Sequence, residues 1–292
     1  MKTFCLTTII IVFLLLCSNG MQAQNTQSKP KETVVAYEVA GMNDVIIKKD
    51  IPYLKTSDST LKMDVYYPPN FDFKSKIPAI VFIYGYTNKG QIKAVGQQLR
   101  KWSAYTSWCK IIAASGMAAI VYETVNPESD LNSLIQYINS SADKLNVDVN
   151  KMGVYTCSAN SPAALANILN NSNSVFKCAV VYYGIFLTAD FKYLSVIDTL
   201  SQNMGFVTPR LSEPTTWKKD VPILIVHAGK DFVPHSDESL TGFIDKAINQ
   251  KVPITLIHYA TGIHGFDVYA DNETIREIIK TTIEFWEFNL NQ

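Results

Sequence analysis

Three polar side chains, far apart in the chain, have the types and the order that make a serine hydroxyl reactive. Ser158 follows one apolar run, Asp231 follows a later one, and His264 lies in the loop after the next. A histidine can take the serine proton as the hydroxyl attacks a carbonyl carbon, and a carboxylate behind the ring fixes its tautomer and stabilises the imidazolium. The three residues therefore predict acyl transfer, with Ser158 as nucleophile, His264 as base and Asp231 as the acid that orients the base.

The segment around Ser158 has the pattern of a strand, a sharp turn and a helix, which is the context of a nucleophile elbow. Such a turn raises the hydroxyl above the sheet, and the next backbone N–H, that of Ala159, faces the oxyanion together with the helix N-terminus. Small residues usually stand two places before and two places after the serine, where this chain has Thr156 and Asn160. Because a serine that opens a helix is also a common N-cap, the elbow gains its support from the acid and histidine that follow.

Neighbouring side chains offer alternative chemistry. Cys157 is a second candidate nucleophile, but it lies one residue before the apex, so its side chain is expected to point to the opposite face and into the core. Asp267 and Asp271 are alternative acids, but neither ends a core strand before the histidine. We interpret Asp267 as a support of its own loop.

The other histidines favour structural roles. His227 and His258 fall near the ends of apolar strands, and we expect them to be hydrogen-bonded structural groups rather than ligands. His235 stands close to Asp237 and Glu238, but no clustered ligand spacing accompanies the three, so a solvated helix start is favoured over a metal site.

Strand and helix patterns alternate along the chain and place the three candidates at strand ends. Two alternating segments, 45–47 and 61–67, predict an antiparallel edge. The runs that are apolar on both faces, as in a buried parallel sheet, are 79–83, 118–122, 152–155, 179–183, 223–226 and 254–257. Helical patterns cover 103–115, 130–144, 162–170, 236–250 and 272–290. The alternation predicts a three-layer α/β fold with a mostly parallel sheet and helices on both faces, which binds ligands beyond the carboxyl ends of its strands.

Four segments together resemble the α/β-hydrolase superfamily, specifically its dienelactone-hydrolase-like and small carboxylesterase branch, over about 61–290. They are 77–86 (IPAIVFIYGY), 148–159 (DVNKMGVYTCSA), 228–234 (AGKDFVP) and 264–267 (HGFD). The resemblance implies an oxyanion hole built from the backbone N–H groups of Tyr86 and Ala159, with Thr87 as a lesser contributor. It also implies ester cleavage through an acyl-enzyme that needs no metal or organic cofactor. Two departures concern the oxyanion loop, where Tyr84 replaces the usual histidine and Tyr86 a common second glycine.

These residues give a leading function and an alternative from another class. The leading hypothesis is an exported serine hydrolase acting on a small-molecule or carbohydrate-linked ester; aryl esters and small lactones are also open. The alternative is an inactive binding protein on the same fold, motivated by Thr156, Asn160, Tyr84 and Tyr86. A dienelactone hydrolase, or a peptidase of the prolyl-oligopeptidase type, ranks lower, the peptidase because no propeller-like region precedes the His/Asp half.

The composition indicates a globular protein, and the N-terminal segment predicts its export. Lys+Arg 26 and Asp+Glu 26 leave a formal net charge of +0, which argues against a nucleic-acid partner, and 47% of residues are hydrophobic. Lys2 and the apolar run 7–16 predict a signal segment, 1–23, cleaved after Ala23, with a lipoprotein acylated at Cys17 or a retained anchor as alternatives. No membrane span is expected in the mature chain, and its oligomeric state stays open.

The mature chain is expected to form one domain, 24–292, without a disulfide framework. Beyond the signal segment three cysteines remain, Cys109, Cys157 and Cys178, and an odd number of scattered cysteines is not a bonded framework. A long segment between two core strands, 185–220, is expected to form either a short cap over the site or a helical cover of the sheet edge.

Overall fold

The computed structural model describes residues 34–291. The predicted signal segment, its cleavage after Ala23 and the alternative role of Cys17 lie outside the described residues. Within 34–291, no helix combines the length and the apolar character needed to cross a membrane.

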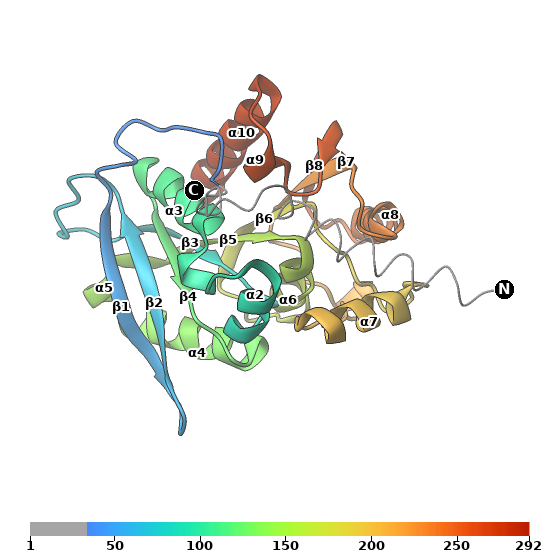
Figure 1. Cartoon of the computed structure of the whole chain (residues 1–292), viewed down its shortest axis with the longest axis horizontal. Helices are drawn as coiled ribbons and strands as arrows, with labels where there is room; N and C mark the ends of the chain where they lie inside the picture. Colours follow the sequence, from blue (N-terminus) through green and yellow to red (C-terminus); the bar gives the residue numbers. More distant parts are fainter. Residues whose placement is uncertain (1–33, 292) are drawn as a thin grey trace, which may run out of the picture. The chain divides into compact units, whose positions relative to one another are not determined.

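In the described part of the chain, eight strands form one sheet in the order β1-β2-β4-β3-β5-β6-β7-β8 (Figure 1). Their bounds are Ile46–Lys55 (β1), Thr60–Tyr67 (β2), Ile77–Phe82 (β3), Ala118–Tyr122 (β4), Val147–Cys157 (β5), Phe176–Tyr182 (β6), Ile223–Lys230 (β7) and Ile254–Ile263 (β8). β1 and β2 run antiparallel to their neighbours, and all remaining pairs are parallel. The antiparallel edge and the mostly parallel sheet are confirmed.

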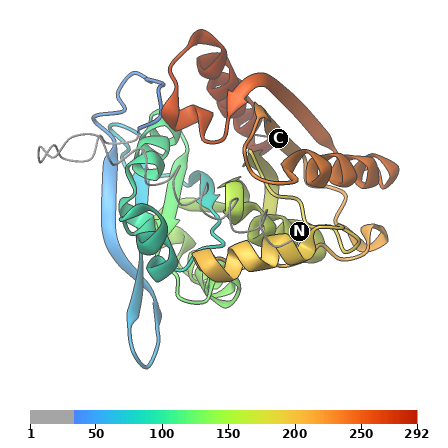
Figure 2. The ribbon, with the colours of Figure 1, turned by 45° about the vertical axis from the view of Figure 1, so that its right-hand side comes forward.

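Helices cover both faces of this sheet, which confirms the three-layer fold. α3 and α10 lie on one face, and α4 and α8 lie on the other (Figures 1 and 2). The α-helices are Asn88–Val95 (α2), Ser103–Ala114 (α3), Pro127–Ser140 (α4), Ala142–Leu145 (α5), Ser161–Leu165 (α6), Leu194–Met204 (α7), Ser236–Asn249 (α8), Phe266–Tyr269 (α9) and Glu273–Leu290 (α10). Short 3₁₀ turns span Leu99–Lys101, Ser158–Asn160 and Pro214–Thr216, and a π-helical turn spans Ala166–Asn170.

The long predicted elements follow the sequence pattern closely. The chain segment Ala118–Tyr122 is buried at every position, as a central parallel strand requires. α10 buries one apolar stripe that includes Ile275, Ile279 and Trp286. The Asn272 side chain caps this helix by accepting a hydrogen bond from the Ile275 backbone N–H.

Some expected elements differ from the pattern; the edge strand expected over 45–47, for example, continues to Lys55 as β1. The helix expected over 130–144 begins earlier, because Pro127 suits a first helical position, and it is interrupted after Ser140. The helix expected over 162–170 continues past Leu165 as the π-helical turn. β8 is an edge strand rather than a fully buried one, and Leu256 is 44% exposed there.

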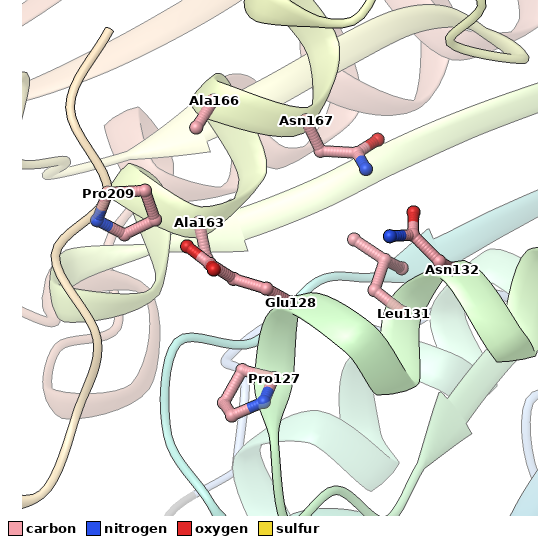
Figure 3. A pocket seen from close by; sticks show the side chains of 8 residues that line it. All are labelled: Pro127, Glu128, Leu131, Asn132, Ala163, Ala166, Asn167 and Pro209. Atoms are coloured by element: carbon pink, nitrogen blue, oxygen red, sulfur yellow. The ribbon is translucent and has the colours of Figure 1, made fainter.

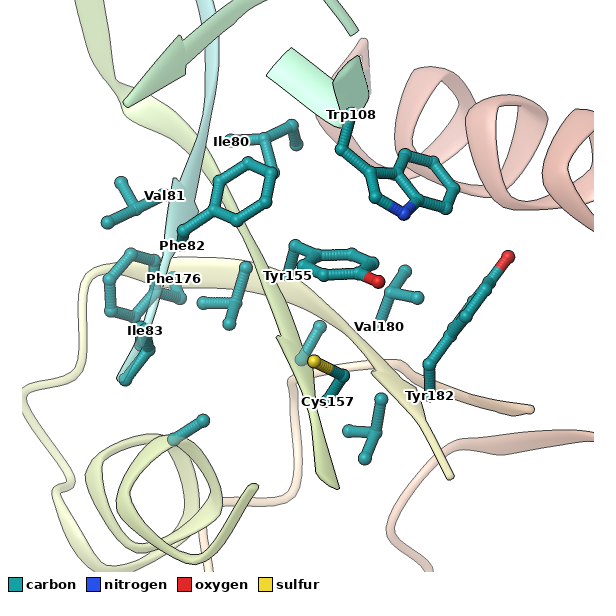
Figure 4. Packing of buried hydrophobic residues seen from close by; sticks show 14 of the residues in the cluster. Ile80, Val81, Phe82, Ile83, Trp108, Tyr155, Cys157, Phe176, Val180 and Tyr182 are labelled. Atoms are coloured by element: carbon teal, nitrogen blue, oxygen red, sulfur yellow. The ribbon is translucent and has the colours of Figure 1, made fainter. Parts of the chain in front are cut away.

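An aromatic cluster packs beneath the carboxyl end of β5 (Figure 4). The Trp108 ring of α3 lies 5.0 Å from that of Tyr155, and the Tyr155 ring lies 5.7 Å from that of Tyr182, measured between centroids. All three side chains are almost fully buried. Because interiors are close-packed, this cluster gives the turn that follows β5 a rigid support.

A buried charge cluster ties the antiparallel edge to the parallel part of the sheet. The Arg100 side chain, 4% exposed, donates to the carboxylates of Asp64 on β2 and Glu123 after β4, and to that of Asp50 on β1. The Asp64 side chain is 6% exposed and that of Glu123 is 14% exposed. Arg100 is therefore the shared counterion of two carboxylates that water barely reaches.

Arg100→Leu is expected to lower the free energy of unfolding by about 3–5 kcal/mol, because it leaves buried carboxylates without their counterion. Urea unfolding at pH 7 measures the loss. The matched control is Lys280→Ala, which removes an exposed pair with Glu277 and should change stability by less than about 0.5 kcal/mol. Equal stabilities for the two variants would contradict this role of Arg100.

Candidate active site

Ser158 lies at the turn between β5 and α6 in a strained backbone conformation. β5 ends at Cys157, and Ser158 opens the 3₁₀ turn with φ +52°, a value uncommon for a residue other than glycine. Its Oγ lies 2.7 Å from Nε2 of His264. The strand, strained turn and helix are the geometry of a nucleophile elbow.

His264 is held from its other side by Asp231. His264 follows the end of β8, and its Nδ1 lies 2.8 Å from Oδ2 of Asp231, which follows the end of β7. Oδ1 of Asp231 accepts a hydrogen bond of 2.8 Å from the Val233 backbone N–H. The Asp231 side chain is 2% exposed and that of His264 14%. With Nδ1–H donating a hydrogen bond to this carboxylate, the lone pair on Nε2 faces the Ser158 hydroxyl.

The three residues expected to act together are thus brought into one chain of contacts at the carboxyl ends of three parallel strands. Sequence reasoning did not identify the two rings that pack on the imidazole. The Tyr183 ring lies 4.6 Å from the His264 ring, and the Phe232 ring lies 5.3 Å from it. Phe232 is 50% exposed, so it presents an aromatic surface beside the catalytic candidates.

Asp267 is fully buried beneath this group and supports it from below. Its carboxylate accepts hydrogen bonds from Trp108 Nε1 (2.8 Å), the Tyr183 hydroxyl (2.8 Å) and the Tyr155 hydroxyl (3.3 Å). Burial raises the pKa of Asp267, and these donors partly offset that rise. Asp271 is exposed and pairs with Arg276. Asp231 is therefore the carboxylate that contacts the histidine.

The loop after β3 packs directly against the elbow. A Cβ atom on Gly85 would lie 2.8 Å from the Ala159 carbonyl oxygen, so only glycine fits without displacement. The Gly85 N–H donates to Oδ1 of Asn160 at 2.8 Å, and the Tyr86 N–H lies 3.4 Å from the same oxygen. The backbones of Tyr86 and Ala159, from which the oxyanion donors are expected, therefore lie on two adjoining turns.

The unusual residues around this site point into the core. The Thr156 hydroxyl donates to the Ile83 carbonyl oxygen, and Thr156 is buried. Tyr84 is buried as well, and its ring lies 5.4 Å from that of Tyr105 and 4.8 Å from that of Tyr122. Neither Thr156 nor Tyr84 therefore occupies the space above Ser158.

Cys157 lies in the core, as expected from its place before the apex. The residue is 4% exposed, it lies among the aromatic cluster (Figure 4), and its Sγ is 3.6 Å from the Tyr105 hydroxyl. Burial raises the pKa of this thiol to about 12, so it stays protonated at neutral pH. Cys109, Cys157 and Cys178 are free and buried.

The remaining histidines form contacts of their own. Nδ1 of His227 lies 2.9 Å from Nδ1 of His258, and Nε2 of His227 lies 2.9 Å from Oδ1 of Asp237. His235 is less solvated than expected, because its ring stacks on that of Tyr193 with centroids 3.4 Å apart. Within 34–291, no group of three or more His, Cys, Asp or Glu side chains is arranged to hold a metal ion.

The segment 185–220 reaches both sides of the site. Phe206 forms a β-bridge with Tyr86, and the Val207 N–H donates to the Gly85 carbonyl oxygen at 2.9 Å. Elsewhere in the segment, the Tyr193 ring stacks on His235, four residues after the candidate acid. A cap over the site and a helical cover of the sheet edge both stay predictions for this segment.

Two hollows border this segment. The first, of about 180 Å³, lies between α4 and α6 and is lined by Glu128, Asn132, Asn167 and Pro209 among others (Figure 3). The second, of about 430 Å³, lies between residues 188–193 and α8. Neither is lined by Ser158, Asp231 or His264. Neither of these two hollows therefore includes the three candidate residues.

Comparison with solved structures identifies the fold. An α/β-hydrolase enzyme, MGS-M1, from a Medee basin deep-sea metagenome library matches 85% of this chain over 99% of its own, with a TM-score of 0.62 at 14% identity. Thermogutta terrifontis esterase 2 matches the same share over 93% of its own chain, with a TM-score of 0.61 at 17% identity. No family model and no curated protein matches the chain by sequence. The protein therefore has the α/β-hydrolase fold.

Proposed function

We propose that this protein is a serine hydrolase that cleaves carboxylic esters through a Ser158 acyl-enzyme. The observation that carries the proposal is the contact chain from Ser158 through His264 to Asp231, with distances of 2.7 and 2.8 Å. These residues follow β5, β8 and β7 on an α/β-hydrolase fold, in the chain order Ser, Asp, His.

The arrangement suits a two-step mechanism. Oγ of Ser158 attacks the ester carbonyl carbon while Nε2 of His264 accepts the hydroxyl proton, and Asp231 stabilises the imidazolium. The N–H groups of Ala159 and Tyr86 are the proposed donors to the tetrahedral oxyanion. The intermediate expels the alcohol, which takes the proton from His264. Water then attacks the acyl-enzyme by the same route, which releases the carboxylic acid and restores Ser158.

Several observations favour hydrolysis over binding alone. Thr156 and Tyr84, two of the residues that motivated an inactive protein, are directed into the core. The Asn160 side chain hydrogen-bonds the loop after β3 instead of projecting above Ser158. The buried Cys157 thiol, with its raised pKa, argues against the thiolate chemistry of a dienelactone hydrolase.

The substrate class and export belong to the same proposal. Thermogutta terrifontis esterase 2 has been solved with butyrate and with propionate bound, at 18% identity to this chain and TM-scores of 0.57 and 0.58. We extend this to esters of short acyl groups on small-molecule or carbohydrate alcohols. The N-terminal sequence supports export by a cleavable signal.

A fluorophosphonate probe tests the nucleophile directly. The purified protein is expected to gain one covalent adduct, located by peptide mass spectrometry at Ser158, because the probe reacts with a serine activated by histidine. Prior incubation with a short-chain ester should slow the labelling. An adduct at another residue, or no adduct together with no turnover across a panel of acyl esters, would refute the proposal.

A further inference from the structure

We infer that Asn160 is a positioning residue whose side-chain amide holds the oxyanion loop against the nucleophile elbow. The chemical consequence of this inference rests on the proposed ester hydrolysis, whereas its geometric part does not. Asn160 is 3% exposed and lies two residues after Ser158, a place where small residues are usual.

The amide oxygen of Asn160 supplies an acceptor that the loop needs. Gly85 is buried and packs closely on the Ala159 carbonyl. Its N–H donates to Oδ1 of Asn160 at 2.8 Å, within the usual range for an N–H···O bond. Without this oxygen, the Gly85 N–H would be a buried donor without an acceptor, which is costly.

The amide nitrogen fixes the other end of the side chain. Nδ2 of Asn160 donates to the Tyr105 hydroxyl at 2.7 Å. Tyr105 is 3% exposed on α3, and its ring packs on those of Tyr84 and Phe82. The Asn160 side chain is therefore held at both ends, and its oxygen has a fixed place.

The same oxygen sets the position of the proposed oxyanion donor. The Tyr86 N–H lies 3.4 Å from Oδ1 of Asn160, which is longer than a normal hydrogen bond. A substrate oxyanion is a stronger acceptor than a neutral amide oxygen, so it can draw this donor to itself. On the opposite side, the Val207 N–H holds the Gly85 carbonyl at 2.9 Å. The N–H and the C=O of Gly85 are thus both anchored. The Tyr86 N–H, which belongs to the same peptide group as the Gly85 carbonyl, is therefore preorganised to face the oxyanion.

Asn160→Ala is expected to lower kcat for a short-chain ester by about 10²-fold, because the oxyanion donor loses its fixed place. KM should change by less than about threefold, since the lost interaction acts in the transition state. Tyr105→Phe keeps the acceptor for the Gly85 N–H and should cost less than Asn160→Ala. Steady-state kinetics on the purified full-length variants measures both effects, and thermal unfolding checks that each variant is folded.

Hydrogen–deuterium exchange of the backbone amides at 84–88 provides a readout that does not depend on activity. Protection of the Gly85 amide should fall in Asn160→Ala and persist in Ser158→Ala. Asn160→Asp, which keeps an acceptor oxygen, should restore protection of the Gly85 amide. Its kcat should stay low, because a carboxylate disfavours a nearby oxyanion.

Unchanged kcat and unchanged protection in Asn160→Ala would overturn the inference and leave the proposed hydrolysis intact. If the wild type neither turns over nor labels, hydrolysis fails, and the exchange data still decide whether Asn160 holds the loop.

Discussion

Ser158→Ala is expected to lower kcat for ester hydrolysis by about 10⁶-fold, the loss typical when the serine of a catalytic triad is removed. The Oγ atom that disappears is the one that lies 2.7 Å from Nε2 of His264. Without it, no acyl-enzyme can form at this position, and the histidine faces a methyl group that has no acidic proton to give. Initial rates with a saturating short-chain ester measure the loss, and fluorophosphonate labelling should vanish with it.

Ser161→Ala is the matched control for this experiment. Ser161 lies three residues further on and is fully buried, and its hydroxyl has no hydrogen-bond partner within the described residues. Its replacement removes the same atom type from the same turn region without touching the triad. Activity within a few-fold of the wild type is expected. A Ser158→Ala variant as active as the Ser161→Ala control would exclude Ser158 as the nucleophile.

The order of elements could be predicted from the sequence because buried strands and amphipathic helices have periodic patterns. The strand 118–122 matches its predicted bounds, and α10 begins one residue after the predicted start. By contrast, no helix is predicted at α2, and α7 falls within 185–220, for which a helical cover is only one of two expectations. α2 contains Gly90 and few apolar residues, and its stability comes from tertiary contact, including a close approach of Gly90 to the Gly205 carbonyl.

The triad contacts could be anticipated because parallel strands end at one edge of a sheet. Ser158, Asp231 and His264 each follow such a strand, so topology alone brings them together. The supporting groups could not be found in the same way. Tyr183 and Asp267 are 84 residues apart and join through a single hydroxyl, a contact for which the sequence has no periodic signal. The acceptor role of Asn160 likewise depends on where the loop after β3 packs.

The site contains two buried carboxylates whose different partners assign them different tasks. The Asp231 side chain is 2% exposed and accepts a hydrogen bond from Nδ1–H of His264. Asp267 accepts from one indole N–H and two phenol hydroxyls, and burial raises its pKa. The first can stabilise an imidazolium as it forms, whereas the second has only neutral donors and holds the Tyr183 ring in place.

Asp231→Asn is therefore expected to lower kcat by about 10⁴-fold with little change in fold. The asparagine oxygen can still accept the Val233 N–H, but an amide N–H₂ would then face Nδ1 of His264. The imidazole would turn to the tautomer with its proton on Nε2, which cannot accept the proton of Ser158. Initial rates across pH measure the loss, and the unfolding midpoint should stay close to that of the wild type.

Asp267→Asn is the control that tells the catalytic effect of Asp231→Asn apart from the general effect of removing a buried carboxylate. Its amide has one acceptor oxygen in place of two and a nitrogen that only donates, so a buried hydroxyl or indole N–H loses its partner at a cost of about 1–3 kcal/mol. The variant should consequently lose stability in urea, while its kcat falls far less than that of Asp231→Asn because the tautomer of His264 is unaffected. If Asp267→Asn lost more activity than Asp231→Asn while remaining folded, the acid would have to be reassigned to Asp267, and the contact between Asp231 and His264 would be structural.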